Sequence, residues 1–80
     1  MTKTFHRFVF VNESLLAKAA LELKFWHIQD SAWWLGSTTN SLVTRDSNVI
    51  DVITETFGFA NNGHNDNYHY TRITNAEEKG

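Results

Sequence analysis

Hydrophobic and polar residues follow two different periods along this chain, and the first segment has the composition of a strand. Residues 4–11 (TFHRFVFV) are mostly β-branched or aromatic, which predicts a β-strand. From Phe8 to Val11 both of its faces are apolar. Such a strand is typical of the centre of a sheet, where it is covered on both faces, or covered on one face while the other serves an interface.

The second segment, residues 12–29 (NESLLAKAALELKFWHIQ), has helical spacing. Asn12 is placed to cap the helix and Glu13 to complement its dipole, and strong helix formers follow. One apolar stripe at helical spacing suits a core: Leu16, Ala19, Ala20, Leu23 and either Trp26 or His27. A second apolar group lies partly outside that stripe: Leu15, Leu21, Phe25 and Ile28. The helix therefore carries more apolar area than one sheet face requires.

Three short segments complete the strands. Residues 31–37 and 41–45 predict a hairpin, because Gly36 and Asn40 between them suit turn conformations. Residues 68–74 (YHYTRIT) predict the last strand by their composition and alternation.

A second helix is predicted over residues 46–59 (DSNVIDVITETFGF). Asp46 or Ser47 is placed to cap it, and Gly58 is placed to end it in a left-handed conformation. One face of this helix is apolar: Val49, Ile50, Ile53 and Phe57. Because Val, Ile and Thr are poor helix formers, tertiary packing must stabilise this helix.

The order of these elements predicts the fold. Strand, helix, strand, strand, helix, strand with right-handed crossovers is the ferredoxin-like βαββαβ plan, an α+β two-layer sandwich. We expect a four-stranded antiparallel sheet in the order 4-1-3-2 with both helices on one face. Eighty residues suit a single domain, residues 1–80, with a polar tail at residues 75–80 that we expect to fray.

Composition and charge narrow the class of protein. The chain is 41% hydrophobic and 14% aromatic, which suits a folded domain, and it has no cysteine for disulfides or thiolate chemistry. No signal peptide and no apolar run of membrane-spanning length is present, so we expect a cytoplasmic protein, in the host cytoplasm if phage-encoded. The net charge is −2, without a basic cluster, so we do not expect nucleic acid or membrane as a partner.

The adjacent tryptophans Trp33 and Trp34 point to a protein interface. Neighbouring side chains on a strand face opposite ways, so we expect one Trp on the sheet face away from the helices. Phe8, Phe10 and Tyr70 are expected to extend an aromatic patch there, and exposed apolar patches commonly mark protein interfaces. The first helix carries surplus apolar residues on its flank, among them Phe25. Homodimerisation through this flank is a second reason to expect a protein interface.

The polar stretch before the last strand holds the candidates for metal or catalytic chemistry. His64, Asp66 and His69 are close in sequence, but their spacing matches no recognised metal signature, and Asn and Gly around them favour a loop. His69 and Thr71 form an isolated H-x-T pair, without the second pair that two-histidine phosphoesterases use. We therefore expect no enzyme, no metal site and no cofactor.

The sequence thus favours a small non-enzymatic protein-binding module, such as a phage or bacterial accessory or inhibitor protein. One alternative is a ligand-sensing regulatory domain that binds a small molecule at a dimer seam, with residues 61–67 in contact with it. Another is a single-stranded nucleic-acid binder that uses the aromatic sheet. The last alternative is a minimal hydrolase or metal protein that uses His64, Asp66 and His69.

Overall fold

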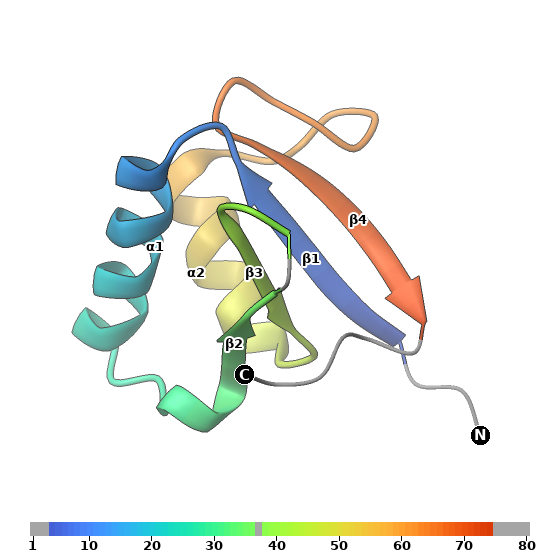
Figure 1. Ribbon diagram of the computed structural model, residues 1–80. Coiled ribbons are helices and arrows are strands. Elements are labelled where there is room, and N and C mark those ends of the chain that lie inside the picture. Colours follow the sequence, from blue (N-terminus) through green and yellow to red (C-terminus); the bar gives the residue numbers. More distant parts are fainter. Residues whose placement is uncertain (1–3, 37, 75–80) are drawn as a thin grey trace.

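The computed structural model describes residues 4–36 and 38–74. In this part of the chain, four strands form one antiparallel sheet, and two helices cover one face of it (Figure 1). The elements are β1 (Thr4–Phe10), α1 (Glu13–Phe25), the single 3-10 turn η1 (Asp30–Ala32), β2 (Trp33–Leu35), β3 (Ser41–Thr44), α2 (Ser47–Phe57) and β4 (Tyr68–Thr74). The predicted order of strands and helices is confirmed.

The sheet has the strand order β2-β3-β1-β4, which is the predicted 4-1-3-2 order when it is counted from the β4 edge. All three neighbouring pairs are antiparallel. In the register of β1 with its two neighbours, Phe8 lies opposite Leu42 of β3 on one side and Tyr70 of β4 on the other. The α+β sandwich with a ferredoxin-like arrangement is therefore confirmed.

The core lies between the sheet and the two helices, and aromatic rings fill much of it. The Phe8 ring lies 5.1 Å from that of Tyr68, and the Phe10 ring 5.3 Å from that of Phe57, both edge to face. Such pairs contribute about 0.5–1.5 kcal/mol beyond their burial. The buried cluster consists of Phe8, Phe10, Ala19, Leu23, Leu42, Val49, Ile53, Phe57 and Tyr68.

Helix α1 begins as predicted but ends earlier than predicted. The Asn12 side chain accepts a hydrogen bond from the Leu15 N–H at 2.9 Å and caps the first turn. At the other end, the Ile28 N–H donates to the Leu23 carbonyl and the His27 N–H donates to the Lys24 carbonyl, both at 3.0 Å. These bonds form a Schellman motif with His27 in the left-handed conformation, at φ 60°. The motif turns the chain back and buries part of Ile28 against the core.

Helix α2 has both of its predicted ends. The Asp46 side chain accepts from the Asn48 N–H at 2.8 Å, and Gly58 follows the helix at φ 96°. The buried Thr44 hydroxyl donates to the Ala32 carbonyl at 2.6 Å and accepts from the Asp46 N–H at 3.0 Å. Thr44 thereby ties the connection before β2 to the connection before α2.

The start of the second strand needs correction. Strand β2 was expected from Ser31, but η1 occupies Asp30–Ala32, and the strand is confined to Trp33–Leu35. The connection 61–67 is a loop, as expected, and it also pairs with β4 through a single bridge between His64 and His69. The predicted fraying of residues 75–80 lies outside the described residues.

Candidate functional site

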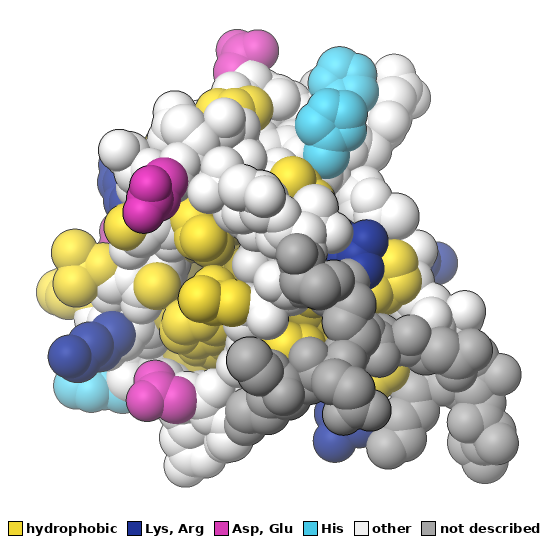
Figure 2. Space-filling model, in the orientation of Figure 1, with side chains coloured by type: hydrophobic (Ala, Val, Ile, Leu, Met, Phe, Trp, Pro, Cys, Tyr) yellow, Lys and Arg dark blue, Asp and Glu magenta, His cyan; other side chains and the backbone are white. Residues whose placement is uncertain are grey.

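The last two turns of α1 expose a cluster of large apolar side chains. Leu21 and Phe25 are four residues apart on one side of the helix, and they are 67% and 69% exposed. Trp26 follows at 57% exposure, and its ring lies 5.7 Å from that of Phe25, edge to face. Figure 2 shows hydrophobic side chains at the surface over α1. We call Leu21, Phe25 and Trp26 the α1 surface.

The termination of α1 places Trp26 where the α1 surface meets a groove. Because His27 takes the left-handed conformation, the chain leaves the helix after Trp26 and leads through η1 into β2. Trp26 therefore belongs both to the exposed end of α1 and to the wall of the groove. The single local feature that makes this geometry is the Schellman motif at His27.

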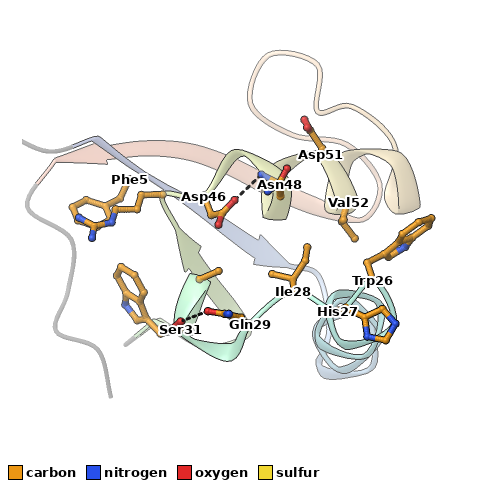
Figure 3. Close-up of a pocket in the computed structure, with 13 residues that line it drawn as sticks. Phe5, Trp26, His27, Ile28, Gln29, Ser31, Asp46, Asn48, Asp51 and Val52 are labelled. Atoms are coloured by element: carbon orange, nitrogen blue, oxygen red, sulfur yellow. Dashed lines mark hydrogen bonds between the residues drawn. The ribbon is translucent and has the colours of Figure 1, made fainter.

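The groove is open to solvent and has a volume of about 1160 Å³. Gln29 and Ser31 lie on one wall, and Asp46, Asn48 and Asp51 lie on the other (Figure 3). Phe5 lies at one end of the groove, and Trp26 and His27 lie at the other (Figure 3). The apolar residues Ile28 and Val52 lie between, half-buried and packed against the core. Arg45 also lines the groove, which therefore combines an apolar base with hydrogen-bonding walls of mixed charge.

The structure confirms that Trp33 and Trp34 face opposite ways. Trp33 packs against the core under the helices, while Trp34 lies on the other face, with its ring 5.6 Å from that of Phe5. Both tryptophans are half-buried, and each indole Nε1 is buried without a hydrogen-bond partner among the described residues. A role of either in binding stays a prediction, but neither presents a whole ring to solvent.

Phe8, Phe10 and Tyr70 do not belong to the patch in which they were predicted. Phe8 and Phe10 are core residues, because the even-numbered positions of β1 face the helices. Tyr70 is opposite Phe8 and faces the same way, packed against the core and half-buried. Alternation along a strand separates its side chains into two faces, but it does not say which face meets the helices. The prediction placed these three rings on the face away from the helices, and the structure places them on the helix face. The aromatic rings on the far face belong to Phe5 and Trp34.

His6 is held against Tyr70 by a contact between distant parts of the chain. The His6 Nδ1 lies 2.5 Å from the Tyr70 hydroxyl, and the two rings are stacked with centroids 5.6 Å apart. Burial, together with the positive charge of Arg72 opposite it, lowers the pKa of His6. A neutral imidazole can accept a hydrogen bond from the Tyr70 hydroxyl at Nδ1, so the low pKa and the hydrogen bond agree.

The candidates for metal chemistry are brought together in part. His64 and His69 are neighbours across the bridge, with ring centroids 5.2 Å apart, whereas Asp66 does not join them. No group of three or more His, Cys, Asp or Glu side chains among residues 4–36 and 38–74 is placed to hold a metal ion. The Asn62-Gly63 pair was the sequence signal for this bridge, because Asn-Gly is typical of two-residue hairpin turns.

Comparison with known proteins gives no relative from which a function could be transferred. No protein-family model, no curated protein and no solved structure matches this chain. Neither helix in the described part of the chain has the length and apolar character that a membrane span needs. We therefore infer function from the geometry of the chain itself.

Proposed function

We propose that the protein is a small non-enzymatic protein-binding module and that a second copy of the same chain covers its α1 surface. The observation that carries the proposal is the exposure of Leu21, Phe25 and Trp26 together at the C-terminal end of α1. Contiguous apolar side chains on a small domain usually mark an interface. Phe59 is 75% exposed, but it stands apart from these three, on the connection after α2.

The energetics favour a contact that is larger than these three side chains. Fully burying one such side chain contributes about 1.5–3 kcal/mol. Association costs about 4–15 kcal/mol in lost freedom, so three side chains alone would give a weak complex. The neighbouring groove offers additional area, and a partner that covers both is the one we expect to bind stably.

A second copy suits this surface in area and in charge. A stable interface takes about 800 Å² from each partner. That is about 15% of the 5382 Å² that the chain exposes. Glu22 and Lys24 lie between the apolar residues of α1 and have opposite charge. Helical spacing puts these two charges on opposite flanks of Leu21 and Phe25, and a two-fold axis nearly parallel to α1 brings opposite flanks of the two helices together. In such a parallel crossing, Glu22 of one copy can approach Lys24 of the other, which suits a two-fold dimer.

Sedimentation equilibrium tests this proposal. We expect wild-type protein to approach twice its 9.2 kDa mass as concentration rises. The variant Leu21→Lys with Phe25→Lys should weaken the dimer at least about tenfold, which is about 1.4 kcal/mol, because it places charges in an apolar contact. Phe59→Lys is the control, since it makes the same phenylalanine-to-lysine change as Phe25→Lys at a more exposed position, and it should dimerise as wild type does.

Two results would contradict the dimer. One is a wild-type protein that stays monomeric at every concentration measured. The other is an equal loss of dimer in the Phe59→Lys control, which would mean that added charge, rather than the α1 surface, controls association. Circular dichroism on each variant confirms that a loss of dimer is not a loss of fold.

A small-molecule sensor is the second candidate function, and the groove of about 1160 Å³ favours it. Ligand sites commonly combine an apolar base with a few polar groups, as this groove does. The substitution Asn48→Trp would fill the groove from an exposed position on α2. A compound that raises the melting temperature of wild type but not of this variant would support the sensor. A compound that stabilises both equally would bind elsewhere.

A further inference from the structure

The connection from α2 to β4 begins with a tight hairpin turn. Asn62 at φ 54° and Gly63 at φ 89° have the left-handed pair of conformations that a type I′ turn requires. The His64 N–H donates to the Asn61 carbonyl at 3.0 Å and closes the turn. A Cβ atom at position 63 would also lie 3.4 Å from the Tyr70 carbonyl oxygen, so glycine suits this position on both grounds.

The turn is fixed against the outer edge of β4. The Tyr70 N–H donates to the Gly63 carbonyl at 2.6 Å, and the Asn65 N–H donates to the Tyr68 carbonyl at 3.0 Å. The Asn65 side chain also donates to the Gly58 carbonyl, at 3.1 Å, which holds the loop to the end of α2. Backbone and side-chain bonds together therefore set where His64 lies.

This backbone places two imidazoles side by side at the surface. His64 and His69 are directly opposite each other in an antiparallel bridge. Their ring centroids are 5.2 Å apart and their planes differ by 28°, and both side chains are exposed. Figure 2 shows histidine side chains next to each other at the end of the molecule where this loop lies.

We propose that His64 and His69 form a two-imidazole chelate for a late first-row divalent metal ion, of which Cu²⁺ binds most tightly. Imidazole nitrogen is a good ligand for Cu²⁺, Ni²⁺ and Zn²⁺, and divalent affinity is greatest for Cu²⁺. Two nitrogens with water in the other positions suit the tetragonal coordination of Cu²⁺ and Ni²⁺. A structural zinc site needs four protein ligands, and the described residues offer no third one here.

The fixed backbone is what makes the pair a chelate rather than two separate ligands. Metal–nitrogen distances are about 2.0–2.1 Å for imidazole, so one nitrogen from each ring must reach a common point. This requires rotation of the two side chains only, because they already lie with ring centroids 5.2 Å apart on paired backbone positions. Because the backbone is already ordered, binding loses little conformational entropy, which is the benefit of preorganisation.

The test is a titration with Cu²⁺ chelated by iminodiacetate, whose carboxylates suppress weaker binding at the N-terminal amine. We expect one Cu²⁺ per chain, with an electron paramagnetic resonance spectrum that reports two imidazole nitrogens. His64→Asn and His69→Asn should each weaken binding at least about tenfold. His27→Asn is the matched control, because it removes another exposed histidine at a left-handed position that asparagine tolerates.

Three results would overturn the proposed chelate. A single coordinated imidazole in the wild-type spectrum would overturn the chelate, and this reading does not depend on any variant folding. Equal affinity in wild type and both single variants would overturn it as well, as would a loss in His27→Asn as large as theirs. The chelate also predicts that Cu²⁺ raises the melting temperature of wild type but not of the single variants, because the pair is assembled only in the fold.

Discussion

At the scale of single residues, the contact between His6 and Tyr70 links stability to pH. The lowered pKa of His6 means that the unfolded chain binds a proton more readily than the folded one does. Above the unfolded pKa of about 6.5 the imidazole is neutral in both states, and its stabilising contact is fully present. As pH falls below that value the unfolded state is protonated first, so the folded state loses stability until the lowered folded pKa is passed.

Denaturant unfolding of wild type and His6→Gln between pH 8 and pH 5 measures this effect. We expect wild type to lose more stability than the variant as pH falls, because glutamine can still accept from Tyr70 but does not titrate. The other histidines are common to both proteins, so the difference isolates His6. Parallel pH dependence in the two proteins would show that His6 is not responsible.

A second residue-scale prediction concerns Tyr68, which is buried and whose hydroxyl donates to the Gly58 carbonyl at 2.6 Å. Tyr68→Phe keeps the ring contacts with Phe8 and Phe10 but removes the shorter of the two side-chain hydrogen bonds to that carbonyl, which Asn65 also contacts at 3.1 Å. We expect the free energy of unfolding to fall by about 0.5–1.5 kcal/mol, the net contribution of one hydrogen bond. Thermal and denaturant unfolding measure the loss, and an unchanged midpoint would show that the Asn65 side chain alone satisfies Gly58.

At the scale of elements, the end of α1 is the boundary that the sequence pattern predicted wrongly. Left-handed residues at helix ends are usually glycine, and here the position is His27, so the apolar pattern predicted a helix that continued to residue 29. A non-glycine residue in this conformation is destabilised by about 1–2 kcal/mol. The contact of Ile28 with the core offsets that cost.

His27→Gly tests the motif directly. We expect the variant to be more stable by about 0.5–1 kcal/mol, because removing Cβ relieves the left-handed strain while the greater freedom of the unfolded chain cancels part of the gain. Thermal unfolding shows whether the substitution raises or lowers the stability. A variant that is less stable than wild type would mean that the His27 side chain itself stabilises this end of the helix.

The hydrophobic periodicity and the residues typical of caps and turns predicted most of the fold. They did not show which face of each strand meets the helices. The caps Asn12 and Asp46, Gly58 after α2, and the bounds of β4 were all found from local patterns. Alternation separated Trp33 from Trp34, but it could not say which face of β1 met the helices, since both were apolar. Phe8 and Phe10 were therefore misplaced, because the answer depends on helix packing and not on β1 itself.

At the scale of the whole molecule, the chain combines an aromatic core with an α1 surface that its own fold leaves uncovered. Short chains bury a smaller part of their surface than long ones, so residues such as Leu21 and Phe25 cannot all be placed inside. Self-association would bury them without adding residues. The prediction that the first helix carries surplus apolar area is confirmed at Leu21 and Phe25, whereas Leu15 and Ile28 pack against the core. The dimer that would use this area stays a prediction.

The most direct test of that central claim is a dilution series followed by two-dimensional ¹H–¹⁵N nuclear magnetic resonance. We predict that amide signals from residues 17–28 move with concentration, together with those of the groove walls. Signals from the connection at Phe59 and from residues 61–67 should stay in place. Shifts confined to the Phe59 region, or no shift at all across the concentration range, would contradict self-association through the α1 surface.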